Sequence, residues 1–419
     1  MDKILVHGGR RLRGSVRISG SKNSALPILA ATLLTKEPCT ITRVPDLSDI
    51  HYMLTILGEL GCEVERASGM VQIRAEHVST AAPYDIVRKM RASVCVLGPL
   101  LGRELEATVS LPGGCVIGDR PIDLHLRGFE ALGATVRVAG GNVKVLAPKL
   151  RGARISLRSN FGSTVLGTGN VMMAAVLAEG ETVIDGAAEE PEVVDLANFL
   201  NAMGAKIEGA GSRTITIQGV KELHGANHEV IPDRIEAGTF LVAGAISGDE
   251  VALQRIQPEH LRTVTEPLAE AGFEILSNGS QLTIRPGAQR RPLKISTMPY
   301  PGFPTDMQAQ MCALLASTGG ISVVTENVFP NRFMHVAELK RMGADIALQG
   351  PTAVITGVPK LSAAPVMASD LRASAALVLA GLQAEGVTEV NRVYHIDRGY
   401  ESIDEKLNAL GAQIERVKA

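Results

Sequence analysis

Leu339-Lys-Arg-Met-Gly343-Ala-Asp-Ile346 is the stretch that decides the fold. The residues before Gly343 end a helical pattern, and glycine at this point is the usual left-handed stop of a helix. The residues after it alternate between apolar and polar side chains, which is the period of a strand. The stretch therefore predicts a helix, a tight stop and a strand, in that order.

The same pattern recurs along the whole chain, and its terminal glycines follow one another at intervals of 68 to 72 residues. The other copies are Leu57-Gly-Glu-Leu-Gly61-Cys-Glu-Val64, Phe129-Glu-Ala-Leu-Gly133-Ala-Thr-Val136, Leu200-Asn-Ala-Met-Gly204-Ala-Lys-Ile207, Leu268-Ala-Glu-Ala-Gly272-Phe-Glu-Ile275 and Leu407-Asn-Ala-Leu-Gly411-Ala-Gln-Ile414. In five of the six copies a turn leads into a second alternating segment, which is a hairpin signal. We therefore predict six copies of one α/β repeat.

A second, more apolar helix opens each repeat. It lacks a broad polar face, so we expect it to be buried. These helices are expected at residues 24–34, 87–101, 164–178, 235–246, 307–316 and 371–382. Repeats of this length are typical of solenoids and propellers, but buried helices favour sheets wrapped around a helical centre.

The two ends of the chain are expected to complete one repeat together. The sixth copy stops at Ala419 without a return strand, whereas Lys3-Ile-Leu-Val6 is a strand-like segment without a partner beside it. Single cores stop growing near ~250–300 residues, so a chain of 419 residues is expected to form two domains. We predict three repeats in each domain, with residues 1–20 and 230–419 in one domain and residues 21–229 in the other.

Composition argues against several classes of protein. The 42 basic and 44 acidic residues nearly cancel, and the basic clusters near residues 10, 88 and 290 are too short for a nucleic-acid footprint. No stretch approaches the ~20 apolar residues that span a bilayer, so we expect a cytoplasmic protein with neither a nucleic-acid nor a membrane partner. The five cysteines are scattered and form no C-x-x-C pair, which argues against a disulfide framework or a structural zinc site.

The glycine-rich segment Leu111-Pro-Gly-Gly-Cys115-Val-Ile-Gly-Asp-Arg120-Pro121 interrupts the repeat pattern and is interpreted as a mobile lid. Its glycines leave the Cys115 sulfur little apolar shelter. A thiol with an ordinary pKa of ~8.5 is mostly protonated near neutrality, so Cys115 is a candidate proton donor. The other cysteines stand among apolar neighbours and are expected to be inert core residues: Cys39, Cys62, Cys95 and Cys312.

Two basic residues lie at the openings of the first two buried helices. Ser19-Gly-Ser-Lys22-Asn23 precedes an apolar run, where free backbone N–H groups and a lysine favour an anion. The alternative for Lys22 is a surface lysine beside capping Ser and Asn residues. Arg91 has an equivalent place in the second repeat, and taken alone it is equally consistent with an arginine that extends its charge to solvent.

Pro299-Tyr-Pro-Gly-Phe-Pro-Thr-Asp306 places three prolines and a glycine ahead of the fifth buried helix. Helix capping by Thr305 or Asp306 is one interpretation. So rigid an approach exceeds what a cap requires and would suit a carboxylate held as a general base. Asp370 and Arg372 stand in the corresponding part of the sixth repeat, and Arg398 follows; for these three, surface ion pairing is as good an interpretation as function.

All these groups fall at the opening of a repeat or in a connecting loop. A pseudo-symmetric array of repeats would bring them towards one cleft between the two domains, where ligands commonly bind. One acid, one base and four cations describe a site for a small anion that undergoes proton transfer; the cations are Lys22, Arg91, Arg120 and Arg398.

Seven segments carry a resemblance to a known family, and they keep its order from Gly20 to Glu401. They are Gly20-Ser-Lys-Asn23, Pro112-Gly-Gly-Cys-Val-Ile-Gly-Asp-Arg-Pro-Ile-Asp-Leu-His125, Glu190-Pro-Glu192, Ile231-Pro-Asp-Arg-Ile-Glu236, Gly302-Phe-Pro-Thr-Asp-Met-Gln308, Asn331-Arg-Phe-Met-His335 and Asp397-Arg-Gly-Tyr-Glu401. At these residues the chain resembles the UDP-N-acetylglucosamine 1-carboxyvinyltransferases, a branch of the enolpyruvyl transferase family. The resemblance implies a two-domain inside-out α/β barrel with three repeats per domain.

The resemblance implies transfer of the enolpyruvyl group of phosphoenolpyruvate to the 3-hydroxyl of UDP-N-acetylglucosamine, the first committed step of peptidoglycan precursor synthesis, without a metal or other cofactor. It implies that Cys115 is the acid and Asp306 the base. Phosphoenolpyruvate would be held by Lys22, Asn23, Arg120 and Arg398. UDP-N-acetylglucosamine would contact Asn23, Arg91, Arg120, Pro121, Ile122, Asp123, Leu124, Asp306 and Val328, with Asp370 and Arg372 in support.

Two alternatives stay open at this point. Transfer to shikimate 3-phosphate shares the donor and the fold, but that branch lacks a cysteine in a Gly-Gly-Cys lid. A non-catalytic UDP-sugar-binding regulator would have no use for Cys115 and Asp306 together. The segment Arg158-Ser-Asn-Phe161-Gly-Ser-Thr164 departs from the sequence associated with uridine and diphosphate contacts, so no contact is assigned to it.

Overall fold

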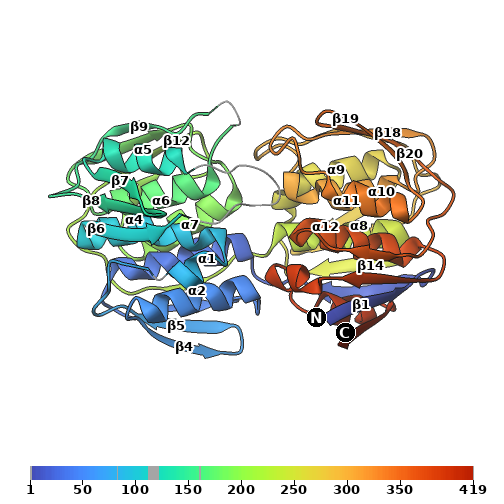
Figure 1. The fold of residues 1–419 in the computed structure, drawn as a ribbon, viewed down its shortest axis with the longest axis horizontal. Helices are drawn as coiled ribbons and strands as arrows, with labels where there is room; N and C mark the ends of the chain where they lie inside the picture. The colour runs from blue at the N-terminus through green and yellow to red at the C-terminus, as the bar shows by residue number, and fades with distance from the viewer. Residues whose placement is uncertain (1, 83, 112–121, 160–161, 419) are drawn as a thin grey trace. The chain divides into compact units, whose positions relative to one another are not determined.

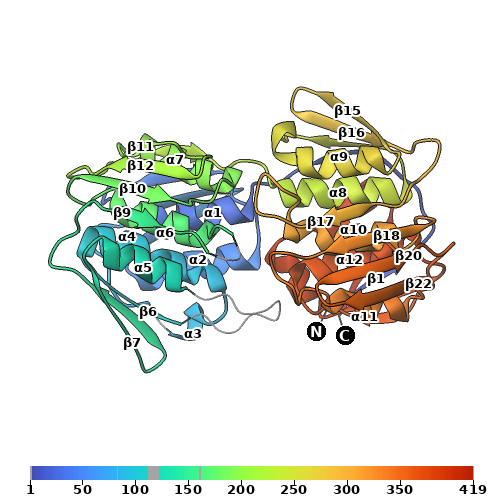
Figure 2. The same cartoon turned by 90° about the horizontal axis from the view of Figure 1, so that it is seen from above.

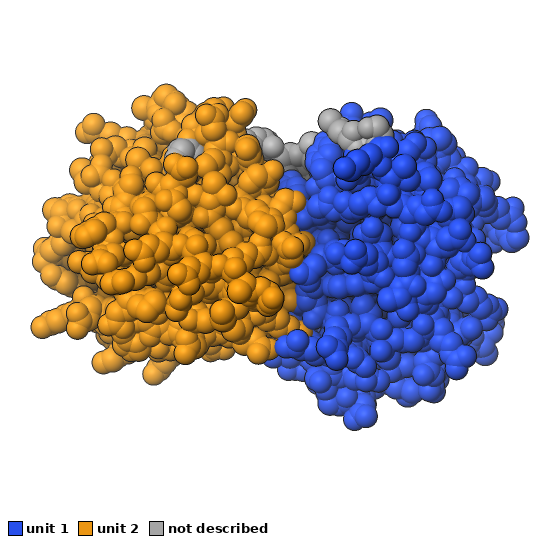
Figure 3. Space-filling view, turned by 90° about the horizontal axis from the view of Figure 1, so that it is seen from below, with its two compact units in different colours: residues 1–19, 116–118, 232–419 blue, residues 20–115, 119–231 orange. Residues whose placement is uncertain are grey.

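The computed structural model describes residues 2–82, 84–111, 122–159 and 162–418. They form two compact units, which Figure 3 shows in different colours. Unit 1 contains residues 2–19 and 232–418, and unit 2 contains the described residues between 20 and 231. The chain therefore leaves unit 1 once and returns to it, so that unit 1 is assembled from two separated stretches.

Unit 2 contains the first three repeats. The first has α1 (Lys22–Ala31), η1 (Thr32–Leu34), β3 (Cys39–Thr42), α2 (Ser48–Glu59), β4 (Glu63–Ala67) and β5 (Met70–Arg74). The second has α3 (Tyr84–Val87), η2 (Arg91–Val96), α4 (Leu97–Glu104), β6 (Glu106–Ser110), α5 (Asp123–Ala131), β7 (Thr135–Ala139) and β8 (Asn142–Leu146). The third has β9 (Arg154–Ser156), α6 (Val165–Ala175), β10 (Glu181–Asp185), α7 (Pro191–Ala202), β11 (Lys206–Glu208) and β12 (Thr214–Gln218); β13 (Asn227–Glu229) follows in the chain but joins the sheet of the first repeat.

Unit 1 contains the last three repeats. The fourth has β2 (Leu12–Arg17), α8 (Arg234–Ser247), β14 (Gly248–Gln254), η3 (Pro258–Leu261), α9 (Arg262–Glu270), β15 (Glu274–Asn278) and β16 (Gln281–Arg285). The fifth has β17 (Lys294–Ser296), η4 (Thr305–Met307), α10 (Gln308–Leu315), β18 (Ile321–Thr325), α11 (Met334–Arg341), β19 (Asp345–Gln349) and β20 (Thr352–Thr356). The sixth has β21 (Pro365–Met367), α12 (Leu371–Gln383), β22 (Val387–Asn391), η5 (Val393–Arg398), α13 (Ile403–Ala409) and β23 (Gln413–Lys418), together with β1 (Asp2–His7).

The repeats share one sheet topology. In the fifth repeat the order is β17-β18-β20-β19, with β17 parallel to β18 and the other pairs antiparallel. The first, third and fourth repeats give the equivalent orders β13-β3-β5-β4, β9-β10-β12-β11 and β2-β14-β16-β15, and the second gives β6-β8-β7. The recurrence of one order confirms that the sequence contains six copies of one unit.

The amino-terminal strand supplies the return strand of the sixth repeat. In the sheet β21-β22-β1-β23, Ile4 lies opposite Val390 on one side and Arg416 on the other. Figures 1 and 2 show the two ends of the chain side by side at this sheet. The two ends of the chain thus lie in one sheet, with β1 between β22 and β23.

The glycine that ends the outer helix of each repeat has the predicted left-handed conformation. Its φ angle lies between +87° and +103° in all six copies, for example +99° at Gly61 and +103° at Gly411. A residue with a Cβ atom is strained at such angles, which explains why the pattern places glycine there.

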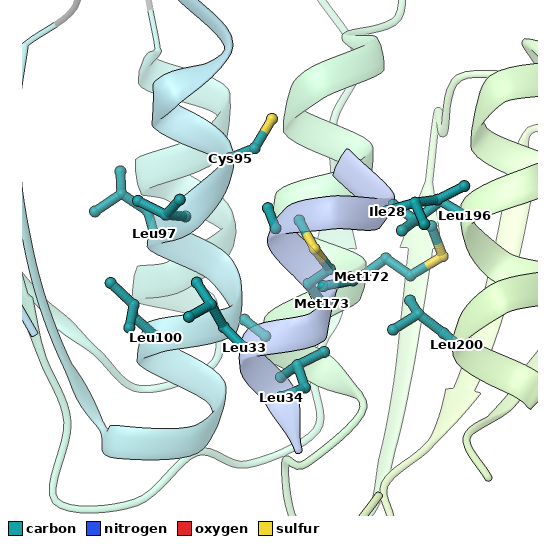
Figure 4. Close-up of a cluster of buried hydrophobic side chains, with 14 of the residues drawn as sticks. Ile28, Leu33, Leu34, Cys95, Leu97, Leu100, Met172, Met173, Leu196 and Leu200 are labelled. Carbon is teal, nitrogen blue, oxygen red and sulfur yellow. The ribbon is translucent and has the colours of Figure 1, made fainter. Parts of the chain in front are cut away.

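The apolar helices form the centres of the two units, as predicted. In α12 the residues from Arg372 to Leu382 are buried, and α12 packs against α8 and α10. Figure 1 shows these helices between β18–β20 on one side and β1 and β14 on the other. Figure 4 shows the corresponding core of unit 2, where side chains from α1, α4, α6 and α7 meet. These arrangements give the inside-out α/β architecture, with sheets outside and helices within.

The second repeat corrects one helix prediction. The expected helix over residues 87–101 is three segments: α3, a 3₁₀ turn (η2) that starts at Arg91, and α4. Met90 is extended, with φ −143° and ψ 126°, and it separates α3 from η2. Pro99 is the third residue of α4, within the first turn, where the N–H group that proline lacks would have no partner inside the helix.

Among the helices that the structure describes, none combines the length and the apolar character needed to cross a membrane.

Candidate functional site

Asp306 forms two ion pairs in unit 1. It lies in η4, and its Oδ1 accepts a hydrogen bond from Arg332 Nη1 at 2.7 Å. Its Oδ2 accepts a hydrogen bond from Arg372 Nη2 at 3.0 Å. Neither Thr305 nor Asp306 caps η4 or α10 with its side chain. The capping interpretation is therefore wrong, and the rigid approach to Asp306 presents its carboxylate to two guanidinium groups.

The two arginines determine the charge state of Asp306. Burial disfavours the ionised carboxyl, but Arg372 and Arg332 outweigh it and hold the pKa of Asp306 well below its ordinary value. The side chains of Arg332 and Arg372 are 8% and 3% exposed, whereas that of Asp306 is 27% exposed. The site thus holds a partly exposed carboxylate that stays ionised beside two buried cations.

The sixth repeat contributes Arg372 from the start of α12. Asp370 is the N-cap of this helix and accepts hydrogen bonds from the backbone N–H groups of Arg372 and Ala373 at 2.9 and 3.1 Å. The Arg372 guanidinium also lies over the ring of Tyr400, 5.3 Å from its centroid. Surface ion pairing is therefore wrong for Arg372, because its side chain is buried where it meets Asp306.

Arg398 ends η5 in the same repeat and is half-buried. Burial lowers the pKa of His395, and the positive charge of Arg398 lowers it further. Val328 lies in the loop after β18, where its N–H group donates to Glu326 Oε1 at 2.9 Å.

Lys22 is the first residue of α1 in unit 2, and Ser21 caps this helix by accepting a hydrogen bond from Ser24 N. The lysine is only 8% exposed, and its Nζ lies 3.2 Å from Oδ2 of Asp49. The interpretation as a surface lysine is therefore wrong. A buried cation at a helix N-terminus has the character of an anion site. Asn23 follows in the first turn and is half-buried.

Arg91 and the start of α5 form a second group in unit 2. Burial and, as a smaller cause, the positive charge of Arg91 lower the pKa of His125 to about 3, so the imidazole is neutral. Ile122 and Leu124 are buried beside it in the sequence, whereas Asp123 is exposed at the first position of α5. The half-buried Arg91 remains consistent with both interpretations given for it from sequence.

Cys115, Arg120 and Pro121 lie outside the described residues. The other four cysteines are buried, as predicted. Burial raises the pKa of each thiol, to about 12 for Cys62 and Cys95. Within the described part of the chain, no cluster of three or more His, Cys, Asp or Glu residues is suited to a metal ion.

The structure adds partners that the sequence did not single out. Arg332 belongs to a segment that resembles the family, but no pattern linked it to Asp306, 26 residues earlier. Asp49 is one acidic residue in the first turn of α2 and carries no local sign of pairing with Lys22. Unit 1 thus holds a carboxylate between buried arginines, and unit 2 holds a buried lysine at a helix start. The carboxylate in unit 1 is suited to accepting a proton, and the lysine in unit 2 is suited to binding an anion.

Comparison with known proteins agrees with this chemistry. The family model described as EPSP synthase (3-phosphoshikimate 1-carboxyvinyltransferase) matches residues 6–407. The chain is 60% identical over 420 aligned residues to a UDP-N-acetylglucosamine 1-carboxyvinyltransferase of Akkermansia muciniphila, with 100% of this chain and 99% of the relative covered. It is 54% identical to the protein of the same name from Myxococcus xanthus, with both chains covered in full.

Solved structures show the same architecture. The enolpyruvyl transferase NikO of Streptomyces tendae superposes with a TM-score of 0.90 at 26% identity, covering 100% of this chain and 99% of that one. An EPSP synthase of Acinetobacter baumannii gives a TM-score of 0.78 at 19% identity over the whole of both chains, a likeness of fold alone. These matches confirm the predicted fold class.

Proposed function

Because this chain belongs to the enolpyruvyl transferase family that includes EPSP synthase, we propose that it transfers the enolpyruvyl group of phosphoenolpyruvate to the 3-hydroxyl of UDP-N-acetylglucosamine. The observation that carries this proposal is 53–60% identity, over the whole chain, to proteins named UDP-N-acetylglucosamine 1-carboxyvinyltransferase. The product would enter peptidoglycan precursor synthesis.

Two alternatives fit less well. The EPSP synthase whose structure superposes on the chain is only 19% identical to it, which disfavours shikimate 3-phosphate as the acceptor. A non-catalytic regulator is disfavoured because the close relatives are named as enzymes. A regulator would also gain nothing from the acid Cys115 and the base Asp306 together.

We propose that phosphoenolpyruvate is held by Lys22, Asn23, Arg120 and Arg398. The buried Nζ of Lys22 supports this assignment, because a cation shielded from water binds a phosphate or carboxylate more strongly than an exposed one. We propose that UDP-N-acetylglucosamine contacts Asn23, Arg91, the residues Arg120 to Leu124, Asp306 and Val328. Asp370 and Arg372 would hold the surroundings of Asp306.

The proposed reaction has two stages. The Cys115 thiol protonates the methylene carbon of phosphoenolpyruvate while the sugar 3-oxygen attacks the adjacent carbon, and Asp306 accepts the hydroxyl proton. The S–H bond, the sugar O–H bond and the π bond of phosphoenolpyruvate break as a C–H bond and a C–O bond form, which gives a tetrahedral phospholactoyl ketal. The Cys115 thiolate then takes a proton back from the new methyl group, and the C–H electrons restore the double bond as the C–O bond to phosphate breaks and inorganic phosphate leaves.

The low pKa of Asp306 places a condition on its proposed role. A base works best when its pKa lies near the working pH, and Arg332 and Arg372 keep Asp306 a weak base. The sugar hydroxyl becomes strongly acidic only as its oxygen bonds to carbon. We therefore propose that proton transfer to Asp306 accompanies C–O bond formation and does not precede it.

Phosphate release tests the proposed function. The chain would be incubated with phosphoenolpyruvate and with UDP-N-acetylglucosamine, shikimate 3-phosphate or no acceptor. We expect release only with the nucleotide sugar. Release with shikimate 3-phosphate alone, or with none of the three, would contradict the proposal.

A further inference from the structure

Glu326 is a buried acid that ties two loops of unit 1 together. It follows β18, and none of its surface is exposed. Its Oε1 accepts hydrogen bonds from Thr297 Oγ1 at 2.6 Å, Val328 N at 2.9 Å and Phe329 N at 3.0 Å. Its Oε2 accepts one from Thr305 Oγ1 at 2.9 Å. These four donors come from the proline-rich loop ahead of Asp306 and from the loop ahead of α11.

The hydrogen bond from Thr305 continues to Asp306. A threonine hydroxyl has one proton, and Thr305 gives it to Glu326, so its oxygen is left to accept. Arg332 Nη1 donates to that oxygen at 3.1 Å and to Asp306 Oδ1 at 2.7 Å. As a carboxylate Glu326 can only accept, and as a guanidinium Arg332 can only donate. The direction of every bond in the row Glu326, Thr305, Arg332, Asp306 is therefore fixed.

We propose that Glu326 is a positioning residue for the transfer reaction. Through Thr305 and Arg332 it fixes the carboxylate of Asp306, and through the backbone of Val328 it fixes the loop proposed to contact the nucleotide sugar. The inference rests on the proposed function, which assigns those two roles. The buried Glu326 carboxylate thereby sets the positions of Asp306, the proposed proton acceptor, and of Val328, a proposed contact of the nucleotide sugar.

A purely structural role for Glu326 predicts a different outcome from a positioning role. Substitutions of two threonines distinguish the two roles. Thr297 and Thr305 each donate one hydroxyl hydrogen bond to Glu326 from the same loop. Only Thr305 also touches Arg332; the Thr297 oxygen instead accepts from the backbone N–H of Asn327 at 2.9 Å. If Glu326 only holds loops, loss of either hydroxyl should act alike. If it positions Asp306, loss of the Thr305 hydroxyl alone should affect turnover.

The experiment compares Thr305→Val, Thr297→Val and Thr305→Ser in the full chain, with phosphate release, titration of UDP-N-acetylglucosamine and thermal unfolding measured on each preparation. Small misplacement of a catalytic group can cost about 100-fold in rate, so we expect Thr305→Val to lose between ~10-fold and ~100-fold in kcat. Its dissociation constant for the nucleotide should stay within about threefold. Thr305→Ser restores the hydroxyl and should restore kcat, while Thr297→Val should lower Tm and leave kcat within about threefold.

Glu326→Gln extends the comparison to the proposed centre of the row. We expect it to lower kcat and also to weaken nucleotide binding, since the Val328 loop loses its charged acceptor. If Glu326→Gln does not fold, the threonine variants still test whether Glu326 positions Asp306. Equal kcat for Thr305→Val and Thr297→Val, or no recovery of kcat in Thr305→Ser, would overturn the positioning role. The proposed function would stand in that case, as long as the unsubstituted chain turns over. Absence of parental phosphate release with the nucleotide sugar would instead overturn the proposed function.

Discussion

Ile4 of β1 pairs with Val390 of β22, 386 residues later in the chain, and both side chains are fully buried. The first strand is therefore part of the unit 1 core. Removing three carbons from a buried isoleucine typically costs about 2–5 kcal/mol, so Ile4→Ala should lower the free energy of unfolding by about that amount. Leu5 is half-buried on the other face of the same strand, and Leu5→Ala should cost less. Denaturant unfolding followed by circular dichroism measures both; equal losses would show that the inward face is misassigned.

The cysteines predict selective alkylation. Burial raises the pKa of Cys39, Cys62, Cys95 and Cys312, so their reactive thiolate forms are scarce at neutral pH. We expect an epoxide phosphonate such as fosfomycin to add once, at Cys115, because its phosphonate would be drawn to the proposed phosphate cations. Intact-mass analysis should show a single adduct that is absent in Cys115→Ser. Full activity in a chain alkylated elsewhere would contradict the assignment.

Substitution of Lys22 should weaken the binding of phosphoenolpyruvate. Hydrogen bonds to charged groups contribute about 1.5–3 kcal/mol, so Lys22→Met should raise the KM for phosphoenolpyruvate by roughly 10- to 100-fold. It should also lower Tm, because it removes the cation that Asp49 contacts. Asp49→Asn is the matched control, since it weakens the same buried pair but keeps the lysine. Comparable KM values for the two variants would show that Lys22 serves the fold and not the substrate.

The periodicity carried most of the information about the fold. Glycines such as Gly343 marked the helix ends, and the missing return strand of the sixth repeat indicated the place of β1. These features are local or nearly so, because they express backbone conformation and the burial of one face. The break at Met90 was missed because its neighbours Arg88, Lys89 and Arg91 are good helix formers, and no glycine or proline stands there to signal a break.

The candidate site was predictable only in part. Lys22 and Asp306 were found because each stands at an unusual helix opening. Their partners were not found, since Asp49 and Arg332 reach them from other segments through tertiary packing. Sequence patterns within one segment also could not decide between a cap and an ion pair for Asp306, because both use the same carboxylate oxygens.

The ion pair between Arg332 and Asp306 predicts a pH effect. A general base must be unprotonated, so activity is lost as the pH falls through its pKa. Arg372 and Arg332 hold the pKa of Asp306 well below its ordinary value, against the effect of burial, so this loss should lie at lower pH than for an ordinary aspartate. In Arg332→Gln one of these charges is gone, and the acid-side fall in kcat/KM should move to higher pH. Phosphoenolpyruvate also titrates, but it does so equally in assays of the parental chain and of Arg332→Gln. If the two pH profiles of kcat/KM fall at the same acidic pH, Asp306 is not the titrating base.

Asp306→Asn separates the proposed catalytic role from the structural one most directly. Asparagine keeps the size and one acceptor oxygen but cannot take up the proton, and general acid–base groups typically contribute on the order of 10²–10⁴ in rate. We expect most turnover to be lost. Because Arg332 and Arg372 lose their shared counter-ion, the free energy of unfolding should also fall, by about 3 kcal/mol; this is the low end for a buried pair, since Asp306 keeps 27% exposure.

The two effects of Asp306→Asn are distinguished by working below its melting temperature and titrating UDP-N-acetylglucosamine on the same preparation. Binding within about tenfold of the parental dissociation constant, equivalent to ~1.4 kcal/mol, would show that the site is intact. Asp233→Asn is the matched control, because Asp233 is a buried carboxylate of the same unit that caps α8 through the N–H groups of Ile235 and Glu236. Asparagine caps a helix as well as aspartate, so the control should keep its turnover. If Asp306→Asn binds the nucleotide and turns over at the parental rate, the proton acceptor must be another group.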